Sequence, residues 1–237
     1  MRAGRRPADD NRIAKIFCSL GLLNLVIVHH VIRRVKLGQD MNKIDPRDVP
    51  IIRSEVTYLE MISNPNVGQA DLGHFQLRKV SNIDVASYLD IYKAVGRDYL
   101  WNYRGGQSAD EIRRILNAPS TWIYLLYQDS AVVGMAELDA TNPKDVELVH
   151  FGLIPRLLHQ GIGRKFLQSI LHLVWNTGVE RMCLSTCGMD HPKAMEFYEN
   201  AGFAKFKTSM DEFKDWRFTG FYTMEDAPQI PLGAKEG

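Results

Sequence analysis

The sequence of 237 residues lacks the features that mark the more extreme classes of protein. It has only three cysteines, a small and odd number that does not suit a disulfide framework, so a reducing compartment is expected. It also lacks an excess of charge: 29 Lys and Arg residues stand against 28 Asp and Glu residues, whereas a nucleic-acid binder usually has a strong basic excess. The hydrophobic fraction of 45% is that of an ordinary globular protein, and one domain with an appendage is the simplest prediction.

The cysteines give no sign of a metal centre either. Cys183 and Cys187 lie four residues apart without a second pair of ligands or a nearby group of histidines, whereas structural zinc sites need four ligands. We therefore expect no metal and no nucleic-acid partner. Because the sparse cysteines indicate a reducing compartment, the predicted location is cytoplasmic.

The first forty residues differ in character from the rest. An apolar stretch without charged residues, 16–32, contains Asn24, His29 and His30. A bilayer-spanning helix needs about 20 apolar residues, and no small-residue cleavage site of a signal peptide follows this stretch. Three interpretations stay open: a membrane tether, an additional amphipathic helix packed on the domain, and an extension ahead of a functional start at Met41. The last two are favoured, so membrane contact through residues 16–32 is the minor alternative.

Residues 41–73 contain several prolines and asparagines and predict a mostly irregular lead-in, with a candidate extended piece at 56–61. From residue 75 the pattern becomes regular. The folded domain is therefore expected over residues 74–225, followed by a tail at 226–237.

Strands and helices alternate over the regular part of the chain. Short apolar runs or strict alternation predict the strands, and apolar residues at helical spacing between capping residues predict the helices. The predicted strands are 75–80, 122–127, 131–138, 146–153, 181–186 and 203–207, and the predicted helices are 83–95, 109–117, 162–176 and 192–201. This order combines hairpins with crossovers, so the predicted fold class is α+β, with a central mixed, mostly antiparallel sheet flanked by helices.

The most informative stretch follows the strand 146–153. Pro155 ends that strand, and Gly161 and Gly163 then precede a strongly amphipathic helix. Glycine lets the backbone turn tightly, and the first N–H groups of a helix have no partner within it. A diphosphate fits such a turn, with help from the helix dipole and from Arg164. The sequence lacks the Lys-Ser/Thr of a P-loop and the third glycine of a dinucleotide fingerprint.

Two motifs in this order resemble the GNAT superfamily of acetyl-CoA-dependent N-acetyltransferases. The turn 161–164, after an apolar strand end and Pro155, resembles the family's Arg/Gln-x-x-Gly-x-Gly/Ala motif. The second motif is matched in spacing by Ala194, Tyr198, Gly202 and Phe203. The resemblance covers residues 75–207, and Phe-Gly-Leu-x-Pro together with Thr-Cys-Gly-Met-Asp-His-Pro is similar to a bacterial subgroup.

The resemblance implies that acetyl-CoA is the cosubstrate and that the glycine turn binds its diphosphate. The residues assigned to it are Phe151, Gly152, Leu153, His159, Gln160, Gly161, Ile162, Gly163, Arg164 and His191. The backbone of 151–153 is expected to donate N–H groups to the acetyl carbonyl and pantetheine, with a bulge at Gly152. Two positions depart from the family pattern. Leu158 stands where the family has Arg or Gln, and His159, Gln160 or Arg164 would compensate for the lost contact. His191 stands where the family has Asn, and it would either donate a hydrogen bond to the cosubstrate or cap the helix.

An alkyl amine must lose a proton before it attacks a thioester, because its pKa is near 10.4. Glu147 is the candidate general base, since it is charged within an otherwise apolar strand and lies fourteen residues before Gly161, a spacing that resembles the glutamate of histone-type members. Its alternative role is an edge-strand carboxylate or a partner of an arginine. Glu137, on the preceding strand, is the rival base, and water could relay the proton in either case.

Tyr198 is the candidate general acid, because a phenol with a pKa near 10 can protonate a departing thiolate with a pKa of about 8.5. Its alternative role is packing in the core. Cys187 is discounted as a nucleophile, because no His–acid pair is evident around it. His150 and His191 are expected to have structural or hydrogen-bonding roles rather than catalytic ones.

The loop 97–106 is rich in aromatic residues, and the resemblance implies that it lies over the acceptor. Tyr99, Trp101 and Glu137 are assigned to the acceptor, a small-molecule or peptide amine that an aromatic face can contact. The alternative is that these aromatics only anchor the loop. The predicted function is transfer of an acetyl group from acetyl-CoA to a primary amine by direct attack through a tetrahedral intermediate. The alternative function is a non-catalytic acyl-CoA sensor or a structural module, and the departure from the family pattern at Leu158 supports it. A homodimer also stays open.

Overall fold

The computed structural model describes residues 44–45 and 47–235, so the apolar stretch 16–32 and the predictions made for it lie outside the described residues. The strands are β1 (Ile51–Met61), β2 (Phe75–Val80), β3 (Thr121–Gln128), β4 (Ala131–Asn142), β5 (Asp145–Leu153), β6 (Arg181–Cys187) and β7 (Ala204–Lys214). The α-helices are α2 (Val85–Gly96), α3 (Ala109–Leu116), α4 (Ile162–Trp175) and α5 (Ala194–Glu199), and 3-10 turns cover Arg97–Tyr99, Pro155–Leu157 and Trp216–Thr219. None of the described helices is long and apolar enough to span a bilayer.

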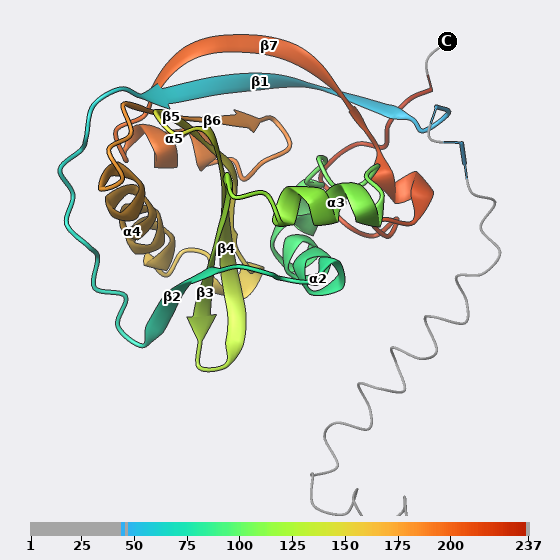
Figure 1. Cartoon of the computed structure of the whole chain (residues 1–237). Helices are drawn as coiled ribbons and strands as arrows, with labels where there is room; N and C mark the ends of the chain where they lie inside the picture. The colour runs from blue at the N-terminus through green and yellow to red at the C-terminus, as the bar shows by residue number, and fades with distance from the viewer. Residues whose placement is uncertain (1–43, 46, 236–237) are drawn as a thin grey trace, which may run out of the picture. The chain divides into compact units, whose positions relative to one another are not determined.

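The seven strands form one sheet in the order β2-β3-β4-β5-β6-β1-β7 (Figure 1). Neighbouring strands are antiparallel except β5 and β6, which are parallel. Strands β1 and β7 lie side by side as a long pair along the top of Figure 1. The predicted α+β class with a mixed, mostly antiparallel sheet is confirmed.

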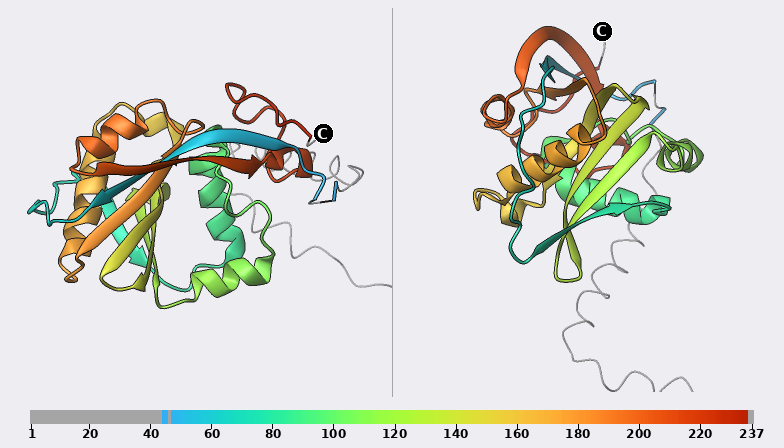
Figure 2. Two further views of the ribbon diagram at one scale, coloured as in Figure 1. Left: turned by 90° about the horizontal axis from the view of Figure 1, so that it is seen from above. Right: turned by 60° about the vertical axis from the view of Figure 1, so that its left-hand side comes forward.

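Helices cover both faces of the sheet, as the two views of Figure 2 show. Helix α4 packs on one face through Phe166, Ile170 and Val174, none of which is exposed, against Val146 and Leu148 of β5. The apolar residues of α4 recur at helical spacing, which places them on one side of the helix.

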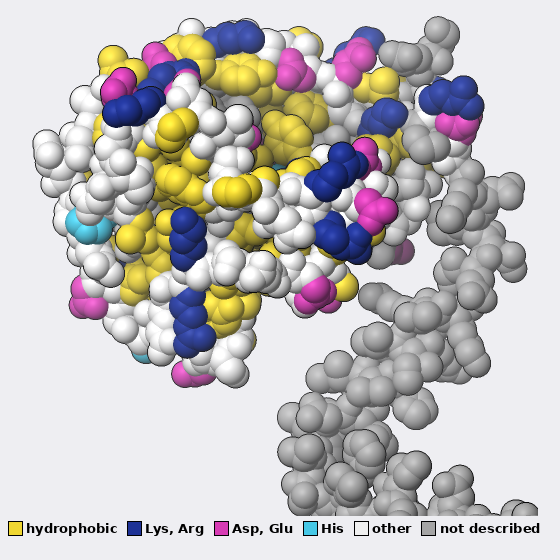
Figure 3. All heavy atoms as spheres, viewed as in Figure 1, with side chains coloured by type: hydrophobic (Ala, Val, Ile, Leu, Met, Phe, Trp, Pro, Cys, Tyr) yellow, Lys and Arg dark blue, Asp and Glu magenta, His cyan; other side chains and the backbone are white. Residues whose placement is uncertain are grey.

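Helices α2 and α3 pack on the opposite face of the sheet. The contacts of Tyr88, Tyr92 and Ile112 are with Ile123 of β3 and Met135 of β4. Burial of an aliphatic side chain such as Ile112, Ile123 or Met135 stabilises the fold by about 1.5–3 kcal/mol relative to its exposure. On the face drawn in Figure 3, basic and acidic side chains are interspersed, in keeping with the balanced composition.

Strand β1 lies within the lead-in predicted over 41–73. It contains the extended piece expected at 56–61 and begins five residues earlier, at Ile51. It pairs with β6 from Val56 to Met61 and with β7 from Ile51 to Glu60, so it lies inside the sheet although it precedes the limits of 74–225 expected for the domain. Prolines suggested an irregular segment, but Pro50 and Pro65 flank the strand and leave its hydrogen bonds intact.

Two helix boundaries also differ from the prediction. Helix α2 begins after Asp84, whose carboxylate accepts a hydrogen bond from the Ser87 N–H, and not after the expected caps at 81–82. Asn82 has a φ of 59°, which is outside the range of an ordinary cap. Helix α5 has only six residues, and the strand expected over 203–207 continues to Lys214 as β7.

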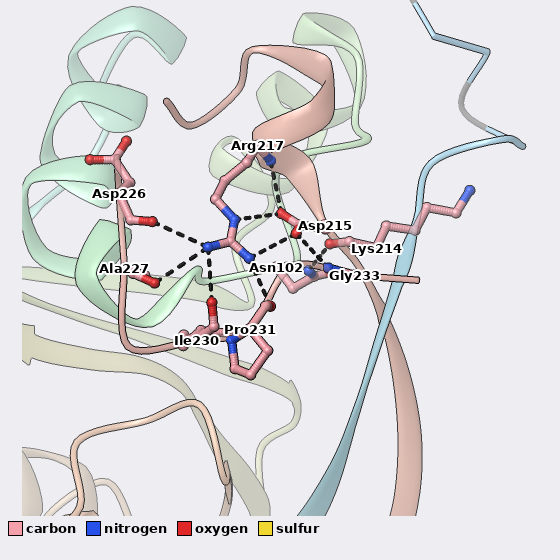
Figure 4. A network of polar contacts seen from close by, with 9 residues as sticks. All are labelled: Asn102, Lys214, Asp215, Arg217, Asp226, Ala227, Ile230, Pro231 and Gly233. Atoms are coloured by element: carbon pink, nitrogen blue, oxygen red, sulfur yellow. Dashed lines mark hydrogen bonds and ion pairs between the residues drawn. The ribbon is translucent and has the colours of Figure 1, made fainter. Parts of the chain in front are cut away.

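The residues after β7 pack on the domain. Ala227 and Ile230 are buried, and Ala234 forms a bridge with Ile51 at the start of β1. A buried ion pair fixes this segment (Figure 4): Arg217 donates from Nε and Nη2 to the two oxygens of Asp215, each at 2.8 Å.

The remaining donors of Arg217 hold the last described residues in place. Its Nη1 donates to the carbonyls of Ala227 and Ile230 at 3.3 and 3.1 Å, and its Nη2 donates to that of Pro231 at 3.0 Å. Burial alone would raise the pKa of Asp215, but the Arg217 guanidinium and the Gly233 N–H lower it on balance. The pair therefore stays ionised at neutral pH and ties the C-terminal segment to the end of β7.

We expect Arg217→Met to lower the free energy of unfolding by about 3–5 kcal/mol, because it leaves Asp215 buried without its partner. Arg53→Met is the control, since Arg53 pairs with Glu212 at the surface and such exposed pairs contribute about 0–1 kcal/mol. Urea unfolding of both variants measures the difference. Equal losses in the two variants would contradict the account of the C-terminal segment.

Candidate active site

The site begins where β5 and β6 separate. Their parallel pairing covers only three residue pairs and ends at Glu147 and Cys183, although both strands continue. Beyond that point β5 stays paired with β4 as far as Leu153, and β6 stays paired with β1 as far as Cys187. Two strands of one sheet thus diverge, and a cleft opens between them.

A cavity of about 690 Å³ fills this cleft, within the volume range of small-molecule sites. Its walls come from β5 (residues 148–153), from β6 (185–187), from the glycine turn and α5, and from the loop 99–103. The cavity therefore joins parts of the chain that the sequence assigned separately to the cosubstrate and to the acceptor.

The glycine turn forms the entry of α4 as predicted. Gly161 is the residue before the helix, with a left-handed φ of 78°, and no side chain caps the first N–H groups. A left-handed φ favours glycine because other residues meet a steric cost of about 1–2 kcal/mol there. Arg164, Lys165 and Lys193 line the cavity beside the uncapped turn. Uncapped N–H groups and three cations together suit an anionic ligand.

Most of the residues predicted to bind acetyl-CoA line this cavity. They are Phe151, Gly152, Leu153, His159, Gly161, Gly163, Arg164 and His191. Gln160 and Ile162 do not line it. The Gln160 side chain donates to the carbonyl of Arg156 at 2.7 Å, and Ile162 is buried in the core under α4. Leu158, the departure from the family pattern, does line it.

Strand β5 presents backbone donors to the cleft. The Ile154 N–H donates to the carbonyl of Val133 in β4. Because successive N–H groups of a strand point to alternate sides, those of Phe151 and Leu153 point away from β4, toward the cleft that β6 has left. The ring of Phe151 lies beside α4, with its centroid 4.8 Å from that of Phe166.

Histidines and a tyrosine meet at the end of the cavity beside the glycine turn. The rings of His159 and His191 lie 5.6 Å apart, and the ring of Tyr99 lies 6.2 Å from that of His191. His191 Nδ1 accepts the N–H of Lys193, so His191 caps the turn that leads into α5, one of its two predicted roles. Burial, His159 and Lys193 lower the pKa of His191, so its ring is neutral and Nε2–H can donate.

The C-terminal segment holds the aromatic loop 99–103 in place. Trp216 Nε1 donates to the carbonyl of Asn102 at 2.9 Å, and the Tyr222 hydroxyl donates to that of Trp101 at 2.8 Å. The Asn102 side chain donates to the carbonyl of Lys214 at the end of β7. These bonds fix the loop, and Trp101 and Tyr103 of this loop line the cavity.

Tyr198 lies on α5 and lines the same cavity. Burial, and then the nearby charge of Asp190, raise the pKa of its phenol, so the hydroxyl keeps its proton at neutral pH. Burial also raises the pKa of the Cys187 thiol to about 11, which does not favour a thiolate nucleophile. Among the described residues, no group of three or more potential metal ligands is found.

The two glutamates predicted as bases do not line the large cavity. Glu147 and Glu137 line a smaller cavity of about 260 Å³ with Tyr103, Arg104 and Asp139. Burial, Asp139 and Asp145 raise the pKa of Glu147. Glu137 is only 2% exposed, so it is not open to an acceptor in the large cavity, where the sequence had placed it.

The sequence analysis missed the wall that β1 and β7 provide. Val56 and Tyr58 of β1 and Asp211 and Phe213 of β7 line the large cavity. The Tyr58 hydroxyl donates to Asp211 at 3.3 Å. The extended piece predicted at 56–61 lies in β1, but nothing in the local pattern indicated that this strand would line the cavity.

Residues 87–203 match the family model described as the Acetyltransferase (GNAT) family. The chain therefore carries a domain of the GNAT superfamily, and the predicted family is confirmed. Comparison with curated protein sequences gives no match.

Solved structures share the fold at low sequence identity. A GCN5-related N-acetyltransferase from Sphaerobacter thermophilus aligns with a TM-score of 0.53 and 13% identity, over 78% of this chain and 56% of that one. A protein assigned to the GNAT family, from Novosphingobium aromaticivorans, aligns with a TM-score of 0.50 and 15% identity, over 71% of this chain and 66% of that one. The chain thus spans less than two thirds of either structure, and the likeness shows the fold.

Two glycines of the site should respond differently to alanine. A Cβ at Gly152 would lie 2.6 Å from Val95 Cγ1, so we expect Gly152→Ala to lower the free energy of unfolding by the 1–3 kcal/mol or so that is typical of overpacking. A Cβ at Gly163 would lie 3.5 Å from its nearest neighbour, an ordinary contact. Gly163→Ala should therefore leave the stability unchanged or raise it by up to about 1 kcal/mol. A comparable loss of stability in both variants, measured by urea unfolding, would contradict the packing described for the cleft.

Proposed function

We propose that the protein is an N-acetyltransferase that moves the acetyl group of acetyl-CoA to a primary amine of a small molecule or peptide. The observation that carries this proposal is the single cavity between the diverging strands, because it joins the glycine turn to the aromatic loop. Membership of the GNAT superfamily supports acyl transfer in general. The amine acceptor and the use of acetyl-CoA belong to the proposal.

The residues of the cavity suit the diphosphate and the pantetheine of acetyl-CoA. The uncapped start of α4, with Arg164 and Lys193 beside it, suits the diphosphate. The N–H groups of Phe151 and Leu153 suit the amide carbonyls of an extended pantetheine, in the manner of an added strand. Gly163 supports the same assignment: packing within the protein does not require a glycine there, so its missing side chain suits the close approach of a ligand.

The acceptor side of the cavity combines aromatic rings with a negative charge. Trp101, Tyr103 and Tyr58 line it together with Asp211. Aromatic faces attract cations, and a carboxylate attracts them further. An amine that arrives as an ammonium ion, with an apolar or aromatic portion, matches this wall. The acceptor is therefore proposed to be such an amine.

The reaction runs by direct attack, without an acyl-enzyme. The neutral amine adds to the thioester carbonyl to form a tetrahedral intermediate, whose oxyanion the N–H groups of β5 are suited to stabilise. As the intermediate collapses, the C–S bond breaks, and Tyr198 donates its hydroxyl proton to the leaving sulfur. A phenol that keeps its proton at neutral pH, in the wall of the cavity, supports this role for Tyr198.

The decisive experiment incubates the full chain with acetyl-CoA and a panel of primary amines, and follows release of the CoA thiol. The panel includes arylalkylamines, polyamines and peptides with a free N-terminus. The proposal predicts thiol release that depends on the amine, with the acetylated amine found by mass spectrometry. Tight binding of acetyl-CoA without thiol release across the panel would instead favour the non-catalytic sensor.

We expect Gly163→Ala to weaken the binding of acetyl-CoA about tenfold, equivalent to 1.4 kcal/mol, because the new methyl group occupies space assigned to the ligand. The measurement is isothermal calorimetry on the folded variant. Arg156→Ala, a change outside the cavity lining, is the control and should bind as the unsubstituted protein does. An unchanged dissociation constant for Gly163→Ala would remove the turn from the proposed cosubstrate site.

We expect Tyr198→Phe to lower kcat about 10²–10⁴-fold, because it removes the proton donor for the thiolate. The KM for acetyl-CoA should change little, since the ring stays in place. Steady-state kinetics with the best amine of the panel measures both constants. A kcat equal to that of the unsubstituted protein would leave Tyr198 with packing alone.

A further inference from the structure

His150 differs from the other titratable residues of the large cavity in being almost wholly buried. It lines the cavity, yet only 4% of its surface is exposed. Its Nδ1 lies 2.9 Å from Oε2 of Glu137, and an ionised carboxylate only accepts hydrogen bonds, so Nδ1 carries the proton. In the neutral ring Nε2 then has a free lone pair.

Nε2 of His150 has no hydrogen-bond partner among the residues that the structure describes. Buried polar atoms are nearly always paired, and each exception calls for an explanation. Nε2 lies on the edge of the ring opposite the one that Glu137 holds. A group that enters the cavity, or a water that accompanies it, would supply the missing partner.

Glu137 is itself held by two further donors. The Tyr88 hydroxyl donates to Oε2 at 2.5 Å, and Arg104 Nη2 donates to Oε1 at 2.5 Å. Arg104 Nε also donates to the Tyr88 oxygen at 2.9 Å, so the three side chains form a closed network. Burial alone would raise the pKa of Glu137, but His150, Arg104 and Tyr88 outweigh it and lower the pKa to about 2. The carboxylate is therefore a fixed negative charge that orients the His150 ring.

Aromatic side chains surround the same ring. The ring centroids of Tyr92 and Trp101 lie 5.0 Å from that of His150, and the centroid of Tyr103 lies at 5.6 Å. Trp101 and Tyr103 belong to the loop assigned to the acceptor. His150 thus lies at the acceptor side of the cavity, whereas Glu147 lines only the smaller cavity.

We propose that His150 is the general base of the reaction, that Glu137 is its positioning residue, and that Glu147 does not take the proton. This inference rests on the proposed function, since it concerns the amine that the same cavity would bind. Nε2 accepts one proton from the ammonium group, directly or through one water. The lone pair that this frees on the amine nitrogen attacks the thioester carbonyl carbon and forms the C–N bond. The electrons of the C–S bond then leave with the sulfur.

The protons of the reaction balance around these two residues. The ammonium ion loses two protons in total as it becomes an amide. The first passes to His150 Nε2 and then to solvent. The second, lost from the tetrahedral intermediate, replaces the proton that Tyr198 has given to the thiolate. The products are the amide, the free thiol and one proton in solution.

The test compares His150→Ala and His150→Gln with Glu147→Gln in the full chain, using the best amine of the panel. Calorimetry with acetyl-CoA and thermal unfolding are measured for every variant. We expect both His150 variants to bind acetyl-CoA within threefold of the unsubstituted protein but to lose about 10²–10⁴-fold in kcat. Added imidazole should raise the kcat of His150→Ala at least tenfold. Glu147→Gln and the surface control His74→Ala should keep a kcat within threefold.

A second measurement does not depend on activity. In ¹⁵N NMR of histidine-labelled protein, His150 is assigned from the signal that disappears in His150→Gln. We expect a proton on Nδ1 and none on Nε2, and we expect Glu137→Gln to abolish this single-tautomer signature. A structural role alone would not give rescue by imidazole.

The outcomes separate this inference from the proposed function. A His150 variant that keeps its kcat while it binds acetyl-CoA overturns the inference and leaves the proposed function intact. So does a loss of kcat confined to Glu147→Gln, or a proton found on Nε2. A chain that binds acetyl-CoA and never releases thiol overturns both.

Discussion

The divergence of β5 from β6 is the constraint on which the site depends. The two strands pair over three residues and then follow different partners, β5 with β4 and β6 with β1. Because each strand keeps its own ladder, the sheet opens without leaving either strand unsupported. The opening exposes one edge of β5 and creates the cavity in which the glycine turn, α5 and the aromatic loop meet. A sheet paired throughout at this point would have no room for a ligand.

Elements distant in sequence hold the opening in shape. The buried pair Asp215–Arg217 anchors the last described residues, and Trp216 and Tyr222 fix the loop that carries Trp101. Helix α4 packs on the face of β5 opposite the one that faces α2, so the two walls of the cleft have separate supports. Residues after β7 therefore belong to the site through the loop that they hold, although they contribute little to the cavity wall itself.

The sequence predicted the regular half of the fold well, because the pattern there is local. The strand 146–153 is a short apolar run closed by Pro155, and α4 shows helical spacing after two glycines; both lie where they were expected. Only the second half of the first strand, 56–61, was expected, because prolines lie near both ends of it and only the tertiary pairing reveals that they flank a strand. The wall formed by Tyr58 and Asp211 was not predicted.

The polar network around Glu137 could not be predicted in the same way. Tyr88, Arg104 and His150 lie 49, 33 and 13 residues from Glu137 in the chain, and no local period links them. Glu137 was expected at the acceptor or as a base, but its three partners make it a buried, fixed charge. His150 was expected to have a structural or hydrogen-bonding role rather than a catalytic one; it does form a hydrogen bond with Glu137, and its proposed role as the base departs from that expectation. Only the three-dimensional arrangement reveals that its second nitrogen has no partner among the described residues.

The most direct test of the central claim is amide hydrogen exchange with and without acetyl-CoA. If the open edge of β5 and the glycine turn form the cosubstrate site, saturating acetyl-CoA should slow exchange in peptides that cover residues 149–153 and 161–164. Exchange in β3, on the far side of the sheet from the cleft, should not change. Unchanged exchange at both segments, or protection confined to other parts of the sheet, would contradict the account.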